Sequence, residues 1–81
     1  MFKVGDKVKV IEEYCGNRQC IGKIGTVIWA SKWDDDYDVQ FDFEIKKYRH
    51  TGQGGIGKLG YTWTYQTEHI ELANEYVVEL L

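Results

Sequence analysis

Eight residues near the middle of the chain alternate strictly between apolar and polar side chains. The apolar members are Tyr37, Val39, Phe41 and Phe43. The polar members are Asp38, Gln40, Asp42 and Glu44. Successive side chains of a β-strand point to opposite faces of its sheet. The pattern therefore predicts a half-buried antiparallel strand over residues 37–44, with an apolar row facing the core and an acidic row facing solvent.

Four further segments carry strand signals, and turn residues separate them. They cover residues 7–12, 23–30, 61–65 and 70–72. Gly25 interrupts the second of them and predicts a β-bulge or a sharp bend there. Residues 67–69 fit a single 3₁₀ turn before the last strand. The sequence predicts an all-β fold of five strands with two long loops, over residues 13–22 and 46–60.

Length and charge predict one small domain. The chain has 81 residues, of which 43% are hydrophobic and 15% aromatic, enough for one compact core. The net charge is −3, and residues 1–60 hold all ten Lys and Arg, so the last 21 residues are acidic. We expect a domain over residues 1–73 and an acidic, apolar tail over 74–81, whose apolar positions fit a helix or a strand. The nucleic-acid-binding signature of a basic domain is absent.

Four spaced elements carry a resemblance to a known fold. They are Val4–Val10, Gly22–Val27, Tyr37–Asp42 and Glu68–Leu72. Together they resemble SH3-like barrels, as found in KOW and mind-bomb-type repeats, the ferredoxin-docking SH3-like subunit of photosystem I, and small bacterial or prophage proteins. The resemblance covers about residues 2–72. It implies a five-stranded SH3-like barrel with long loops and a bacterial or phage origin, but this fold hosts many functions.

The second long loop contains a formal G-x-G-x-x-G motif at Gly52, Gly54 and Gly57. Such a motif binds phosphate when it follows a strand and opens a helix, whose free N–H groups point at the anion. Here it leads into the predicted strand over residues 61–65. We therefore interpret the loop as a mobile hairpin tip, because glycine has high backbone freedom and no side chain to pack.

A local basic patch suggests nucleic-acid binding as an alternative function. The patch consists of Lys46, Lys47, Tyr48, Arg49 and Lys58. Basic side chains next to an aromatic ring can contact phosphates and stack on a base. The same charges also suit a solvated loop that keeps a long hairpin soluble.

The residues able to bind a transition metal are few and irregularly spaced. Four residues separate Cys15 from Cys20, and His50 and His69 lie far downstream. This spacing matches no usual zinc site. We predict no metal, no cofactor and two free thiols, one semi-buried and one in a loop. The chain start lacks the apolar segment of a signal peptide, and no apolar run is long enough to span a membrane. These features predict a cytoplasmic protein.

Aromatic residues give the main functional prediction. They exceed what so small a domain can bury, and exposed Tyr and Trp beside acidic residues are typical of protein contacts. Ser31 is the only serine, and no nucleophile has a base nearby in the sequence, so an enzyme is not expected. We predict a non-enzymatic module that docks on a larger protein partner. Its predicted contact residues are Tyr14, Trp33, Tyr37, Tyr48 and Tyr61.

Overall fold

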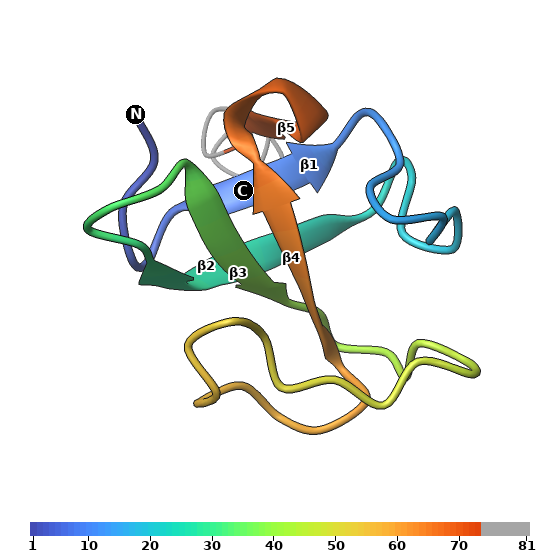
Figure 1. The fold of residues 1–81 in the computed structure, drawn as a ribbon. Helices are drawn as coiled ribbons and strands as arrows, with labels where there is room; N and C mark the ends of the chain where they lie inside the picture. Colours follow the sequence, from blue (N-terminus) through green and yellow to red (C-terminus); the bar gives the residue numbers. More distant parts are fainter. Residues whose placement is uncertain (74–81) are drawn as a thin grey trace.

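The computed structural model describes residues 1–73, which form one antiparallel sheet of five strands (Figure 1). The strands are β1 (Lys7–Val10), β2 (Ile24–Ala30), β3 (Asp36–Gln40), β4 (Thr62–Gln66) and β5 (Ile70–Leu72). A 3₁₀ turn, η1 (Thr67–His69), precedes β5, and no α-helix occurs in the described residues. The all-β prediction and the predicted 3₁₀ turn are confirmed. The predicted tail over 74–81 lies outside the described residues.

The strands lie in the order β4-β3-β2-β1-β5, and every neighbouring pair is antiparallel. The sheet is strongly twisted, so that β4 crosses β1 and β2 at a steep angle in Figure 1. Within residues 1–73, β4 and β5 are the two edges, and no strand pairing closes the sheet. The prediction of five strands is confirmed, and the strands form one antiparallel sheet. Closure of this sheet into a barrel remains a proposal.

The predicted strand over residues 37–44 ends earlier than its alternation indicates. Pairing of β3 with β4 stops at Gln40, opposite Thr62. One more backbone bond follows, from Phe41 N to Tyr61 O at 2.8 Å, and the chain then bends. Phe43, predicted for the core, is consequently only half-buried and packs on the Phe41 ring at a centroid distance of 5.2 Å.

Gly25 is needed for close packing and does not form the predicted bulge. The irregularity in the β2–β3 pairing lies between Val27 and Trp29 instead. A Cβ atom at Gly25 would lie 2.6 Å from the Val39 Cγ1 atom and 2.9 Å from the Gln40 carbonyl oxygen. Glycine at this position therefore allows β3 to cross β2 closely.

The core forms on the concave face of the sheet as the alternation predicts. Val39 and Phe41 of the predicted apolar row are buried, and so are the alternating residues Val8, Val10, Val27 and Ile70 of the other strands. Cys20, Ile45 and Tyr65 complete the cluster together with Tyr37. Tyr37 is only 5% exposed and packs edge-to-face against Phe2, so its predicted role as a docking residue is wrong. Its place in the apolar row of β3 explains this burial.

Two ionisable side chains lie in this core. Burial raises the pKa of the Tyr65 phenol well above 10, and the negative charge of a Cys20 thiolate would raise it further. Burial likewise raises the pKa of the Cys20 thiol above 9. Among the described residues, the Tyr65 hydroxyl has no hydrogen-bond partner. Both groups are therefore protonated and uncharged in the folded protein.

We expect the free energy of unfolding to fall as the pH rises above about 9. The unfolded chain then releases these protons while the folded protein retains them. For each group, the free energy of unfolding falls by up to about 1.4 kcal/mol per pH unit. Tyr65→Phe should leave stability at pH 7 nearly unchanged, because the hydroxyl can lose only a contact with the Cys20 thiol, a weak hydrogen-bonding group, and should flatten the fall above pH 10. Urea denaturation between pH 7 and 11 measures this. Tyr61→Phe, at a half-exposed position, is the matched control, and an equally steep fall in both variants would contradict the assignment.

Candidate functional site

Asp38 holds the glycine-rich part of the second loop against the sheet. Its side chain lies on the face of β3 away from the core, yet it has no exposed surface. The carboxylate accepts hydrogen bonds from Gln53 N at 2.9 Å, Gly54 N at 2.8 Å and Thr64 Oγ1 at 2.6 Å. Three donors around a buried carboxylate satisfy its oxygens. The prediction that Asp38 belongs to a solvent-facing acidic row is therefore wrong.

The three glycines of the G-x-G-x-x-G motif are the points of closest approach between this loop and the sheet. A Cβ atom at Gly54 would lie 2.5 Å from Trp29 Cγ, and one at Gly57 would lie 2.7 Å from the Thr51 carbonyl oxygen. Gly52 has a positive φ of 89°, and a Cβ there would collide with the Asp38 carboxylate. The loop leads into β4, as predicted, but it is packed on the sheet and is not a free hairpin tip.

The first loop, residues 11–23, contains a tight turn from Tyr14 to Asn17. These two residues form an antiparallel bridge, and the central residues Cys15 and Gly16 have φ values of 56° and 79°. Two positive φ values are the geometry of a type I′ turn. Asn17 is fully buried, and its side-chain oxygen accepts a bond from Gln19 N at 3.0 Å. The turn thus holds Tyr14 and Cys15 in a defined position.

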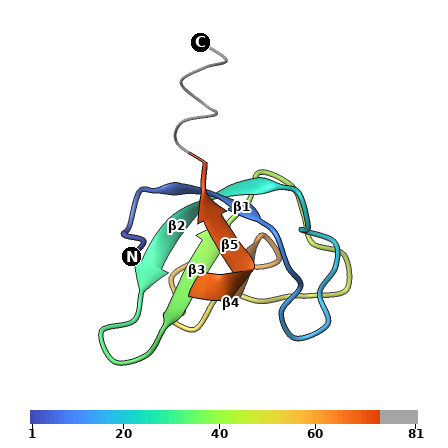
Figure 2. The same ribbon diagram turned by 90° about the horizontal axis from the view of Figure 1, so that it is seen from above.

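Gln19 connects the first loop to the second. Its side-chain oxygen accepts a hydrogen bond from Lys46 N at 2.8 Å, and its side-chain nitrogen donates one to Lys46 O at 2.6 Å. The Gln19 side-chain amide therefore bonds both backbone groups of Lys46, as the backbone of a paired β-strand would. The first loop and the start of the second loop lie on the right-hand side of both Figure 1 and Figure 2.

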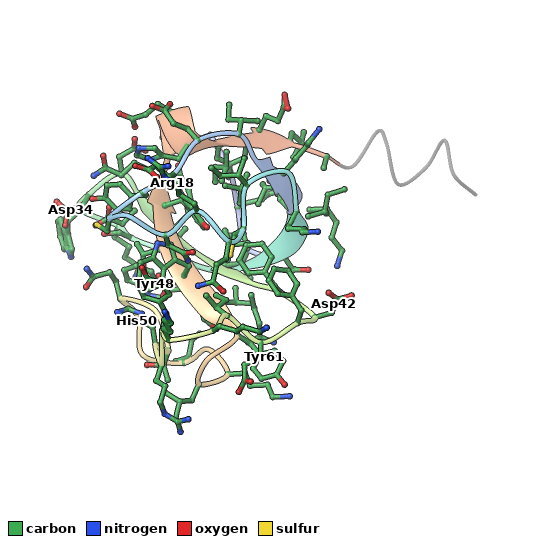
Figure 3. The ribbon with its side chains drawn as sticks, turned by 90° about the vertical axis from the view of Figure 1, so that its right-hand side faces the viewer. Arg18, Asp34, Asp42, Tyr48, His50 and Tyr61 are labelled. Atoms are coloured by element: carbon green, nitrogen blue, oxygen red, sulfur yellow. The ribbon has the colours of Figure 1, made fainter. Side chains whose placement is uncertain are left out.

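A pocket of about 200 Å³ lies between the two loops and β4. We call it the aromatic pocket, and its lining residues are Tyr14, Cys15, His50, Gln53, Trp63 and Thr64. The indole nitrogen of Trp63 donates a hydrogen bond to Tyr14 O at 3.0 Å, which ties β4 to the first loop. Tyr48 packs edge-on against Trp63 at a centroid distance of 4.8 Å. Figure 3 shows Tyr48 and His50 close together on this face.

The two histidines near the pocket each accept a backbone hydrogen bond on Nδ1. His50 Nδ1 accepts one from Gly52 N at 2.8 Å. His69 Nδ1 accepts one from Gln66 N at 3.1 Å, and the His69 ring stacks on Tyr14 at a centroid distance of 4.6 Å. These contacts fix the orientation of both rings beside the pocket.

Carboxylates approach the pocket from the side of η1. Partial burial raises the pKa of the Tyr14 phenol, and the negative charges of Cys15, Asp36 and Glu68 raise it further. Asp36 accepts a hydrogen bond from the Gln66 side chain at 3.3 Å. Glu68 is exposed within η1, next to His69. Asp36 and Glu68 are therefore the carboxylates that act on Tyr14.

The structure separates the five predicted contact residues. Tyr14 lines the aromatic pocket and Tyr48 supports it from behind Trp63. Trp33 is 91% exposed in the β2–β3 turn, where its backbone N–H donates to Ser31 Oγ, and it does not line the pocket. Tyr61 lies elsewhere, with the Lys58 ammonium 4.0 Å from its ring centroid. Tyr37 belongs to the core, as described above.

Tyr61 lines a second, more open groove of about 480 Å³. The groove is bordered by Thr26, Ile28, Gln40, Phe41, Asp42, Lys58 and Tyr61. Figure 3 shows Tyr61 and Asp42 well apart from Tyr48 and His50. The predicted basic patch is divided in the same way. Lys46, Lys47 and Arg49 are exposed at the start of the second loop, whereas Lys58 lies in this groove.

Sequence reasoning missed Trp63 and His50 as pocket residues. The alternation over residues 61–65 places Trp63 on the core side of β4, where it pairs with Val39. Because β4 is an edge strand, this side chain remains half-exposed. The position of Trp63 within the last long alternating segment carries no signal that the strand lies at the edge.

No metal site forms among the described residues. Cys15 is exposed and Cys20 is buried, and both are free thiols. Within residues 1–73, no three His, Cys, Asp or Glu side chains come together in a group able to hold a metal ion. The described part of the chain also has no helix that is long and apolar enough to cross a membrane.

Comparison of the chain with protein-family models, curated proteins and solved structures finds no match.

Proposed function

We propose that this chain is a non-enzymatic, SH3-like protein-binding module that docks on a larger partner through the aromatic pocket. The observation that carries the proposal is the pairing of Tyr14 and Trp63, from two distant segments, around one pocket. Tyr and Trp are the residues that most often dominate binding energy at protein interfaces. At about 200 Å³ the pocket is smaller than typical small-molecule sites, and this size favours a single inserted side chain.

The rigid frame of the pocket supports the same function. The Trp63–Tyr14 bond, the Gln19–Lys46 pair and the Asp38 contacts to the second loop hold all of its walls. A preformed site loses less conformational entropy on binding than a flexible one. Trp33 is exposed in the β2–β3 turn and is a candidate for a second contact with the partner.

The side-chain chemistry gives little support for catalysis. Ser31 Oγ accepts hydrogen bonds from two backbone N–H groups of its own turn, at 3.2 Å from Trp33 N and 3.0 Å from Asp34 N. His50 Nδ1 accepts the hydrogen bond of Gly52 N, so this atom is not free to act as a base.

The placement of the basic residues gives little support for nucleic-acid binding, which needs one continuous basic surface. Lys46, Lys47 and Arg49 lie at the start of the second loop, whereas Lys58 lies in the second groove.

Tyr14→Ala should reduce partner capture about 30-fold, which corresponds to about 2 kcal/mol for a central aromatic anchor. The measurement is affinity capture from lysate of the source cells, with and without nuclease, followed by quantification of the captured protein. Tyr61→Ala, which removes an equal side chain from the second groove, is the matched control and should retain the partner. Melting curves of both variants establish that the fold is intact.

Capture that survives Tyr14→Ala in a folded protein would contradict the proposed site. Recovery of nuclease-sensitive nucleic acid, lost on charge reversal at Lys46 and Lys47, would favour the nucleic-acid alternative, because phosphate contacts depend on basic side chains and weaken with salt.

A further inference from the structure

The aromatic pocket combines π-faces with hydrogen-bond acceptors. Tyr14 and Trp63 supply the rings, and Thr64 and Gln53, which are joined by a hydrogen bond from Gln53 N to Thr64 Oγ1 at 3.2 Å, supply side-chain oxygens. The negative face of an aromatic ring attracts a cation, most strongly when the ring is Trp or Tyr and the site is partly desolvated. Such a lining suits a side chain with an aliphatic stem and a charged end.

The pocket contains no positive charge of its own that would oppose a bound cation. His50 is the only basic side chain that lines it, and its Nδ1 accepts a hydrogen bond from Gly52 N at 2.8 Å. Arg18, the closest base in the first loop, forms an ion pair with Glu13, with 2.6 Å between Nε and Oε2. Lys46 and Lys47 point into solvent on the second loop and do not line the pocket.

Acidic residues lie around η1, which contacts Tyr14. The Tyr14 ring stacks on His69, and Glu68 is the exposed residue before His69. Asp36 accepts a hydrogen bond from the Gln66 side chain at the start of this turn. Asp35 accepts hydrogen bonds from Thr67 N at 3.2 Å and from the Thr67 hydroxyl. A cation entering from the side of η1 is attracted before it reaches the rings.

We propose that the aromatic pocket accepts the cationic side chain of an arginine or lysine in the partner protein, with Tyr14 and Trp63 against its charged group and Glu68 at the entrance. This inference rests on the proposed function, because it names the chemistry of the side chain that the docking site takes.

The test compares two peptides that differ only in charge. The full ¹⁵N-labelled chain is titrated with Gly-Gly-Arg-Gly-Gly and with the same peptide containing citrulline, which has nearly the shape of arginine but no charge. The indole N–H signal of Trp63, identified by its loss in Trp63→Phe, reports occupancy of the pocket. We expect the arginine peptide to bind about two- to fivefold more tightly, the range typical of an exposed cation–π contact.

Glu68→Gln should weaken binding of the arginine peptide by up to about fivefold and leave the citrulline peptide unchanged, as expected for an exposed ion pair. Asp42→Asn, a matched change beside the second groove, should alter the binding of neither peptide.

Equal binding of the two peptides would contradict the proposal that the bound side chain is cationic. If no peptide shifts the Trp63 signal while partner capture still requires Tyr14, the inference fails and the docking function stands. If capture is also independent of Tyr14, both fail.

Discussion

Phe41→Ala is expected to lower the free energy of unfolding by about 3–5 kcal/mol, a large part of the total stability of so small a domain. Phe41 is only 4% exposed, and its ring lies where a Cβ atom at Gly25 would meet it at 2.9 Å. The aromatic ring therefore fills the space between β3 and the glycine of β2. Its removal leaves a cavity that the close crossing of the two strands cannot fill.

Denaturant titration followed by tryptophan fluorescence measures this loss. Phe43→Ala is the matched control, because the same ring is removed two residues later from a half-buried site, and the loss should be clearly smaller. Equal losses at the two positions would mean that β3 continues past Gln40 and that the bend described above is wrong. A Phe41→Ala variant as stable as the parent would contradict the core assignment itself.

Asp38→Ala is expected to destabilise the protein by about 3 kcal/mol or more. The substitution leaves Gly54 N–H and the Thr64 hydroxyl without their acceptor in a buried site, and Gln53 N–H keeps only its longer bond to Thr64 Oγ1 at 3.2 Å. Hydrogen bonds to a charged group contribute about 1.5–3 kcal/mol each, and a buried donor without a partner costs about 1–3 kcal/mol. Urea denaturation gives the total effect.

Amide hydrogen exchange distinguishes local release of the loop from general loss of stability. In Asp38→Ala, the amides of Gln53 and Gly54 should exchange much faster, while the amide of Val27 in β2 should change only as far as global stability changes. Asp42→Asn, an exposed acid on the same chain segment, is the control and should leave both unaffected. Unchanged protection of Gln53 and Gly54 would show that Asp38 does not hold the loop.

The core was predictable because period-2 patterning reports directly on which face of a strand is buried. Val8, Val10, Val27 and Val39 follow from this rule alone. The rule does not show what covers the outer face. Asp38 satisfies the pattern of an exposed residue, and it is buried only because a segment about fifteen residues later folds back over it.

The candidate site was predicted only in part for the same reason. Tyr14 and Tyr48 were selected because they are aromatic residues in loops, and both lie in or behind the aromatic pocket. The alternation of β4 places Trp63 on the core side, and its partial exposure depends on β4 being an edge strand. Tyr37 and Tyr61 are tyrosines near polar residues, as Tyr14 is. Tyr37 nevertheless faces the core from β3, and Tyr61 lies in the second groove. Long-range strand order is not encoded in a local pattern.

The packing of the glycine loop on β2, β3 and β4 couples positions that look independent in the sequence. Gly54 faces Trp29, Gly52 faces Asp38, and Gly57 faces Thr62. An alanine at position 54 is compatible with this packing only if the side chain at position 29 becomes smaller. At position 52 the positive φ also disfavours alanine, and at position 57 the Thr51 carbonyl oxygen also lies too close, so a smaller facing side chain alone does not make room. Position 54 is therefore coupled to position 29, whereas glycine at positions 52 and 57 is required by the backbone as well as by the facing side chain.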